Sequence, residues 1–203
     1  MIYDISPLIS PRTAVWPGDQ PFERSVALDM ANGDNLTLSS VTTTVHIGAH
    51  VDGPNHYKKD GADIGARSLE LYMGDCQIIT VSIPLGTRIE TCPVEIKAPR
   101  VIFRTDSAPD PDHFNEDFCA LSPQLINYLA DRGVRLAGID TPSVDLYDDK
   151  VLLSHNAIAT HDMAILEGVV LTGVPDGVYN LIALPLKLEG ADASPVRAVL
   201  ISK

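Results

Sequence analysis

The chain is poor in basic residues, in cysteine and in long apolar runs, and each shortage excludes a class of protein. Fifteen lysine and arginine residues stand against 27 acidic ones, which gives a formal net charge of −12. Nucleic acid and anionic membrane surfaces bind basic patches, so we expect neither as a partner. No apolar run approaches the roughly 18 residues that a membrane span requires.

The three cysteines argue against an oxidised or thiolate-based protein. Cys76, Cys92 and Cys119 are odd in number and show no C-x-x-C spacing. This pattern is typical of reduced thiols rather than of a disulfide framework or a thiolate metal site. The first residues lack a basic segment followed by a long apolar core, so no secretory signal is visible. We therefore expect a cytoplasmic protein.

Several catalytic signatures are also missing. The sequence has no G-x-S-x-G elbow, no G-x-G-x-x-G loop and no Walker loop, so serine, dinucleotide and P-loop chemistry find no support. A chain of 203 residues with 45% apolar residues suits one domain with a well-filled core. Because no linker and no internal repeat divides it, we expect a single domain over residues 1–203.

Strand patterns outnumber helix patterns along the chain. Continuous apolar runs at Cys76–Ile83 and Arg100–Arg104 predict strands buried on both faces. Ser122–Arg132 begins with Ser-Pro and predicts a helix, and Ser68 and Ser154 are candidate caps of two shorter helices. Since the clearest helix signals lie between strands, the sequence favours an α/β fold over an all-β sandwich.

The densest chemistry lies in His46–His56, whose sequence is H-I-G-A-H-V-D-G-P-N-H. It holds three of the chain's six histidines and one carboxylate. Imidazole nitrogen and carboxylate oxygen are favoured ligands of zinc and related divalent ions. Gly48, Gly53 and Pro54 oppose a helix. The alternating run Leu36–Val45 precedes the motif, with a change of phase near its fourth residue that predicts a bulge. We therefore expect a strand that ends in a turn.

Such a strand and turn can present His46, His50 and Asp52 to a single ion. This leaves His56, whose neutral imidazole can relay protons near pH 7. The chemistry that this arrangement predicts is hydrolysis by water bound to a metal.

Further candidates lie in the last third of the chain, where spacing alone does not choose between them. His155 with Glu167 forms one group, but a surface histidine and an edge-strand glutamate would account equally well for these two residues. His161 and Asp162 compete for the same role.

Two residues outside these groups need an interpretation. The only tryptophan, Trp16, lies in a loop before a Pro-Gly turn. A core anchor is the ordinary interpretation of a tryptophan, but a loop position favours a binding surface. His113, beside a proline and an aspartate, is expected to be a solvated loop residue.

The motif resembles the H-x-G-T/A-H-x-D-x-P-x-H signature of the cyclase-like metal-dependent hydrolases. Within that group the chain looks like the bacterial kynurenine formamidases, or arylformamidases. The likeness runs nearly from end to end, and it is carried also by Ile5–Pro7, Val15–Asp19, Gly138–Ser143, Ala164–Glu167, Leu181–Leu186 and Ser194–Leu200. It implies a swivelling β/β/α fold with a mixed or barrel-like central sheet and few helices.

The resemblance also implies a site with two divalent metal ions, usually Zn²⁺ and alternatively Mn²⁺. His46, His50 and Asp52 would hold one ion, and Asp52 would bridge to a second ion held by His155 and Glu167. This choice sets His161 aside.

The remaining roles follow from the same resemblance. His56 would be the proton donor and acceptor, and Trp16 would line the pocket of an aromatic substrate. Two positions depart from the pattern: Asn156 stands where a second histidine is common, and Ala49 where threonine is common.

The activity implied is hydrolysis of N-formyl-L-kynurenine to L-kynurenine and formate, in tryptophan degradation. Two other functions fit the same residues. One is a sibling cyclic-amide hydrolase such as an isatin hydrolase, and the other is a metal-binding protein without catalysis. The resemblance implies a homodimer with each active site near the subunit interface.

Overall fold

The chain folds into thirteen strands, two α-helices and four short 3₁₀ helices, and the computed structural model describes residues 1–203. The strands are β1 (Ile2–Asp4), β2 (Glu23–Leu28), β3 (Leu38–Thr42), β4 (His50–Asp52), β5 (Met73–Thr80), β6 (Arg88–Ile89), β7 (Arg100–Arg104), β8 (Ala120–Leu121), β9 (Leu136–Ile139), β10 (Ala164–Glu167), β11 (Gly177–Ile182), β12 (Ala193–Pro195) and β13 (Val199–Ser202). The helices are α1 (Pro123–Ala130), α2 (Leu153–Thr160), η1 (Met30–Asn32), η2 (Pro54–His56), η3 (Ile64–Ala66) and η4 (Leu69–Leu71).

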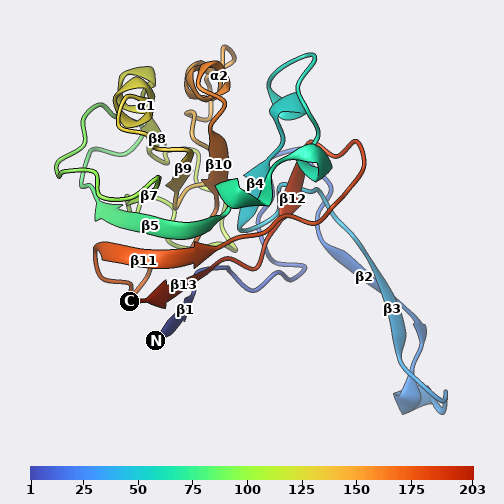
Figure 1. The fold of residues 1–203 in the computed structure, drawn as a ribbon. Coiled ribbons are helices and arrows are strands. Elements are labelled where there is room, and N and C mark those ends of the chain that lie inside the picture. The colour runs from blue at the N-terminus through green and yellow to red at the C-terminus, as the bar shows by residue number, and fades with distance from the viewer.

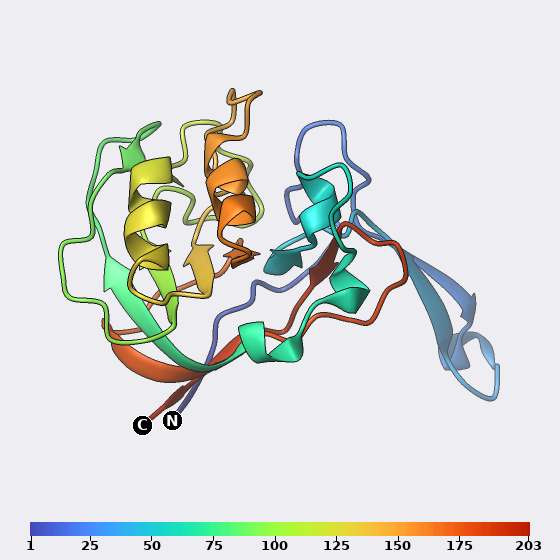
Figure 2. The ribbon, with the colours of Figure 1, turned by 45° about the horizontal axis from the view of Figure 1, so that its top comes forward.

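A nine-stranded mixed sheet forms the centre, with the order β1-β13-β11-β5-β7-β9-β10-β4-β12 (Figure 1). Strands β5, β7, β9 and β10 run parallel to one another. The antiparallel strands β11, β13 and β1 extend one side, and β4 and β12 extend the other. The sheet curls, and both chain ends lie at the same end of the molecule (Figure 2). The prediction of a mixed central sheet with few helices is confirmed.

The parallel strands have an apolar cluster on each face because side chains alternate along a strand. On one face, α1 and α2 lie side by side over the sheet (Figure 2). Phe103 and Ile165 of the strands pack in the same cluster as Leu125 of α1 and Ile158 of α2. The opposite face carries a second cluster of 21 buried residues, which extends to β4 and β13. None of the helices has both the length and the apolar character needed to cross a membrane.

The predicted helices at α1 and around His155 are present, but the serine caps predicted for the two shorter helices are wrong. Ser122 caps α1 as expected, since its hydroxyl accepts the Leu125 amide at 3.1 Å. Ser68, however, makes no capping bond, and the segment after it is a single 3₁₀ turn before β5 begins. Helix α2 begins at Leu153 instead, and Ser154 lies inside its first turn with its hydroxyl donating to the Leu121 carbonyl.

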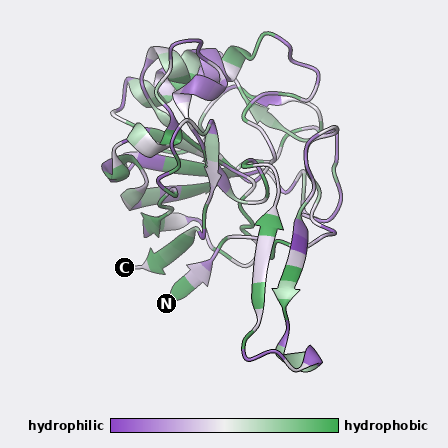
Figure 3. Cartoon of the chain, turned by 90° about the vertical axis from the view of Figure 1, so that its right-hand side faces the viewer, coloured by the Kyte–Doolittle hydropathy of each residue, from purple (hydrophilic) through white to green (hydrophobic).

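Strands β2 and β3 form a two-stranded arm that projects from the body of the molecule (Figure 1). Nearly all of its residues are exposed. Figure 3 shows apolar positions on both of its strands. The bulge predicted in β3 lies instead in β2, where the register shifts between Val26 and Leu28.

Two glycine turns meet where β10 ends and the histidine motif begins. Gly168 has φ +64°, and a Cβ built on it would lie 2.2 Å from the carbonyl oxygen of Gly48. Gly48 itself has φ +59°. Only glycine allows this backbone conformation together with so close an approach. The contact fixes the turn of the motif against the end of β10, which carries Glu167.

The substitution Gly168→Ala is therefore expected to destabilise the fold far more than an ordinary glycine replacement. Gly173 is a matched control, because it has φ +76° and open space around its Cα. We expect Gly173→Ala to cost about 1–2 kcal/mol of unfolding free energy from backbone strain alone. Gly168→Ala adds a clash with backbone and should cost roughly 3–5 kcal/mol. Urea unfolding of both variants measures this, and equal losses would contradict the account.

Candidate metal centre

Strand β4 carries two of the predicted ligands on one face. His50 and Asp52 are two residues apart on the strand, so their side chains point the same way. Both are buried. His46 lies in the turn before β4 rather than on a strand, and His56 ends the 3₁₀ helix after it. The motif is therefore a turn, a short strand and a second turn, whereas the sequence predicted a strand followed by one turn.

The register between β4 and β10 brings Glu167 to this group. Glu167 lies directly opposite His50 in the antiparallel pair, and its Oε2 is 3.1 Å from His50 Nε2. Its other oxygen accepts the backbone amide of Val144 at 2.6 Å, which fixes the carboxylate. A sequence separation of more than a hundred residues is closed here by one strand pairing.

His155 comes from the first turn of α2. The residue before this helix, Leu152, has φ +56°, and the Asp145 carboxylate accepts the amides of Ser154 and His155 at the helix start. Asp145 thus does the capping that the sequence assigned to Ser154. The ring points inward, with Nε2 at 3.4 Å from Asp52 Oδ2 and 4.0 Å from Glu167 Oε1.

Each of three imidazoles has its outer nitrogen occupied and its inner nitrogen turned toward Asp52. His50 Nδ1 donates to the Gly48 carbonyl at 2.9 Å, and His155 Nδ1 lies 2.8 Å from Asp145. His46 Nε2 lies 3.0 Å from Asp192. The inner nitrogens of His46, His50 and His155 lie 3.3, 3.6 and 3.4 Å from Asp52 oxygens. Metal-ligating histidines have this arrangement, because the outer bond fixes the tautomer.

The inner atoms are buried without hydrogen-bond partners, which is the observation that fits a metal. His50 Nε2, His155 Nε2 and both oxygens of Asp52 make no hydrogen bond and are inaccessible to solvent. Buried polar atoms are normally paired, and convergent nitrogen and carboxylate donors are a divalent-metal set. Two triads have donor atoms within 4.8 Å of one another, His46–Asp52–His56 and His50–Asp52–Glu167, and Asp52 belongs to both.

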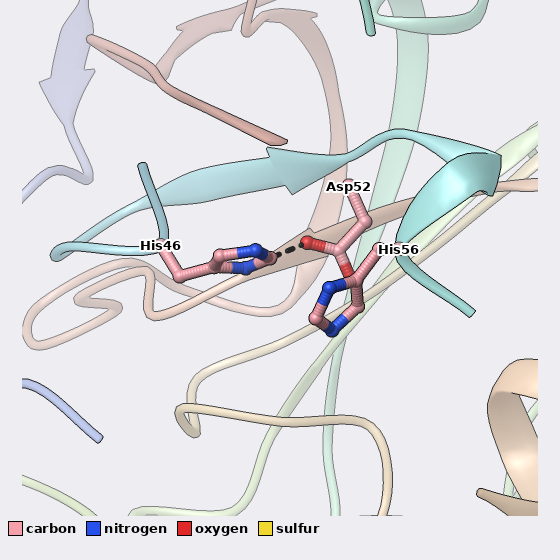
Figure 4. A group of neighbouring side chains, drawn as sticks. All are labelled: His46, Asp52 and His56. Atoms are coloured by element: carbon pink, nitrogen blue, oxygen red, sulfur yellow. Dashed lines mark ion pairs between the residues drawn. The ribbon is translucent and has the colours of Figure 1, made fainter. Parts of the chain in front are cut away.

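Figure 4 shows how the first triad lies. His46 and His56 flank the Asp52 carboxylate, and the ion pair joins His46 to Asp52. The rings of His46 and His56 are 4.3 Å apart. His56 is the more exposed of these side chains, with 34% of its surface accessible. Among the imidazoles around Asp52 it therefore has the most access to solvent. Its ring also lies within reach of the donor group, which we define as Asp52 with His46, His50, His155 and Glu167.

The carboxylates control the protonation of the buried imidazoles. Burial opposes the charge on His46, but the nearby carboxylates of Asp52 and Asp192 outweigh this and raise its pKa to about 9. Burial likewise opposes the charge on His155, and Asp145 and Asp52 together raise its pKa to about 10. Burial alone would raise the pKa of Asp52, yet the surrounding imidazoles hold it well below its usual range.

A cavity of about 370 Å³ opens beside the donor group. His46, His50, His56, His155 and Glu167 all line it. Trp16 also lines it, and its ring centroid is 5.3 Å from that of Phe114 and 5.2 Å from that of Tyr147. The predicted pocket tryptophan therefore lies in the same cavity as the predicted ligands, within an aromatic cluster.

The other polar residues considered from the sequence do not belong to the donor group. His161 Nε2 bonds to Asn127 at 2.8 Å, and Asp162 pairs with Arg67, both away from the donor group. Asn156 donates to the Val151 carbonyl at 2.7 Å and does not line the cavity. His113 is an exposed loop residue as predicted, but it lies at the cavity.

The sequence interpretation missed two carboxylates that hold imidazoles from outside the donor group. Asp145 lies two residues after the Asp-Thr-Pro-Ser segment that follows β9. That polar segment at the end of a strand was a signal in the sequence that Asp145 could lie near the metal centre. Asp192 lies near the end of the chain and has no local motif. Only the fold reveals its contact with His46.

Comparisons with known proteins identify the family and the fold. A family model described as "Putative cyclase" matches residues 3–146. One solved structure, described as a potential metal-dependent hydrolase with cyclase activity, is 26% identical with a TM-score of 0.84 and covers 98% of this chain and 96% of its own. A predicted metal-dependent hydrolase from Bacillus stearothermophilus is also 26% identical, with a TM-score of 0.83 and coverage of 98% and 97%.

A third solved structure shares the fold at lower identity. It is an isatin hydrolase bound to the product analogue thioisatinate, 21% identical, with a TM-score of 0.82 and coverage of 100% and 92%. The predicted cyclase-like fold is confirmed by these similarities.

Metal uptake by the metal-free protein is expected to release protons. The pKa values of His46 and His155, about 9 and about 10, keep both rings protonated at pH 7.5. A metal binds only the deprotonated ring, so about two protons should leave per chain when both rings bind. Raised pKa values stabilise the metal-free fold below about pH 6.5, and this contribution disappears as the pH rises through 9–10.

Zinc titration calorimetry at pH 7.5, in buffers of different ionisation enthalpy, counts these protons. Affinity should also rise with pH up to about 10, because both rings must lose a proton. Binding without proton release at pH 7.5 would contradict the arrangement.

Proposed function

This chain belongs to the cyclase family of metal-dependent hydrolases, and from that premise we propose that it hydrolyses N-formyl-L-kynurenine to L-kynurenine and formate. The proposal includes two divalent ions per chain, most often Zn²⁺ in this kind of site and alternatively Mn²⁺. His46, His50 and Asp52 would hold one, and Asp52, His155 and Glu167 the other. A nitrogen and carboxylate set of this kind accepts several divalent metals.

The observation that carries the proposal is the position of the donor group in an aromatic-walled cavity. The donors and Trp16 line the same cavity, and Phe114 and Tyr147 pack around that indole. A cavity of about 370 Å³ is in the range of small-molecule sites. A flat aromatic amide placed against Trp16 would bring its carbonyl group toward the donors, and a rigid indole wall orders such a ring at low entropic cost.

The reaction needs one bond to form, one to break and one proton to move. Divalent ions bound here would lower the pKa of water and polarise a carbonyl oxygen. The water gives up a proton as its oxygen joins the formyl carbon, the C–N bond breaks, and the departing aryl nitrogen takes that proton. His56 is proposed to hold and deliver that proton, because it lies at the cavity beside Asp52 and has access to solvent.

Two other functions remain as alternatives. The fold likeness to an isatin hydrolase favours a cyclic-amide substrate as the second candidate. The same cavity and the same aromatic wall would serve that flat, bicyclic amide. A metal-binding protein without catalysis is a third reading, but it gives no role to a cavity lined by aromatic residues beside the donors.

Turnover of the two substrates tests the proposed function. We expect the zinc- or manganese-loaded protein to hydrolyse N-formyl-L-kynurenine with kcat/KM at least about tenfold above that for isatin. Loss of absorbance of each substrate measures this. A preference for isatin would support the second candidate, and no turnover of either amide would support the third.

The same assay tests the role of His56. His56→Ala should lower kcat by about 10²–10⁴, because a general acid is removed, while metal content stays at the parent value. His161→Ala is the matched control, since that imidazole bonds to Asn127 away from the cavity. Parent turnover in His56→Ala would contradict the role. Loss of metal from it would assign His56 to the ligands, as its position in the first triad allows.

We also propose that the protein acts as a homodimer in which the β2–β3 arm contacts the second copy. The arm pairs only with itself, and a two-stranded ribbon alone is marginally stable in water. It exposes Val26, Leu38 and Val41. Its base borders the cavity, because Thr44 bonds to Asp19, which lines that cavity. A partner held by the arm would therefore lie near the active site.

A charge placed on the arm should separate the copies. Val41→Asp puts a carboxylate on a valine that is 59% exposed, and Val94→Asp does the same at a valine that is 48% exposed elsewhere. We expect a dimer for the parent and Val94→Asp, and a monomer for Val41→Asp, since burying an unpaired charge opposes association. Light scattering after size exclusion measures the mass. A dimer in both variants would contradict the proposal that the arm is part of the interface.

A further inference from the structure

Asp192 is a carboxylate that contacts two of the site's imidazoles at once. It precedes β12, and its Oδ2 lies 3.0 Å from His46 Nε2 and 3.5 Å from His56 Nδ1. It is the only acidic side chain within 4.0 Å of His56. Neither the donor triads nor the proposed reaction uses Asp192.

The backbone around Asp192 is locked to the histidine motif. The Asp192 carbonyl accepts the Gly53 amide at 2.8 Å, and the Ala191 carbonyl accepts the Ile64 amide at 3.0 Å. Ala193 pairs with Asp52 across the β4–β12 ladder. The approach is so close that a Cβ on Gly53 would lie 3.2 Å from the Asp192 carbonyl oxygen. The origin of the Asp192 side chain is therefore fixed relative to both imidazoles.

This position determines which nitrogen of His46 faces the donors. With Nε2 bonded to Asp192, Nδ1 is the nitrogen that lies 3.3 Å from Asp52 Oδ1. A carboxylate on the outer nitrogen fixes the tautomer and the ring plane of a ligand. Asp145 does the same for His155, but Asp192 also reaches the imidazole that is proposed to carry the proton.

We propose that Asp192 is a positioning residue that orients His46 for metal binding and His56 for proton transfer. The inference rests on the proposed function, because it gives His56 its role in hydrolysis. One carboxylate thereby couples the geometry of a ligand to that of the proton carrier. Its removal should weaken metal binding and, separately, slow the reaction when metal is saturating.

The experiment compares Asp192→Ala with Asp63→Ala. Asp63 anchors the same segment, since it accepts the Gly190 amide at 2.7 Å, but it touches no imidazole. Zn²⁺ is titrated into metal-free protein against a chromophoric chelator, and kcat and KM for N-formyl-L-kynurenine are measured at saturating Zn²⁺. Asp192→Asn keeps one acceptor oxygen in a side chain of the same shape, and it serves if the alanine variant does not fold.

We expect Asp192→Ala to lose about 10–100-fold in Zn²⁺ affinity and a further tenfold or so in kcat, with KM within about threefold of the parent. Asp192→Asn should give values between those of Asp192→Ala and the parent. Asp63→Ala should stay within about threefold of the parent in Zn²⁺ affinity, kcat and KM. Affinity and kcat equal in Asp192→Ala and Asp63→Ala would overturn the proposal. A fall in Zn²⁺ affinity with kcat equal to that of the parent would overturn the proposal that Asp192 orients His56. If the parent does not hydrolyse the substrate, the proposed function fails, and the titration alone judges Asp192.

Discussion

The Asp52 carboxylate imposes the constraint on which this structure depends, because it is buried and none of its oxygens accepts a hydrogen bond. A charge in that position needs compensation, since burial without a partner is among the most costly arrangements in a protein. The chain answers by turning three imidazoles toward it, each with its outer nitrogen held by a carbonyl or a carboxylate. In the metal-free protein, protons on His46 and His155 balance this charge. The same convergent donors are the groups that would hold divalent ions in place of those protons.

The fold supplies these contacts by switching from parallel to antiparallel pairing at β10. The parallel strands β5, β7, β9 and β10 carry the two apolar clusters and form a rigid base. Beyond them, β4 pairs with both β10 and β12, so one three-residue strand receives Glu167 from one side and the Asp192 segment from the other. Glycines at 48 and 168 allow the turns to approach. The cavity with Trp16 lies where these segments meet, so binding of an aromatic amide and the proposed metal chemistry share one rigid frame.

The sequence predicted whatever depends on local pattern. It predicted α1 with its Ser122 cap, the buried strands and the motif as a metal-binding candidate, whereas the mixed sheet was implied by the family resemblance. Spacing left His155 and His161 undecided, and only the resemblance favoured His155; the structure brings His155 to Asp52 and leaves His161 on Asn127. The errors have a common cause, which is partners distant in sequence. Asp145 caps α2 in place of Ser154, the bulge lies in β2 and not in β3, and Asp192 reaches His46 from near the chain end. No local sequence pattern predicts these contacts, because they form only when distant segments meet in the folded chain.

We propose that Asp52 is shared by two divalent ions, each completed by residues from different segments. Anomalous diffraction from crystals of the zinc-loaded protein, collected on both sides of the zinc absorption edge, tests it most directly. The account predicts two peaks per chain beside Asp52, with His46 and His50 at one and His155 and Glu167 at the other. A single peak bound by His46, Asp52 and His56, or no peak at Asp52, would contradict it.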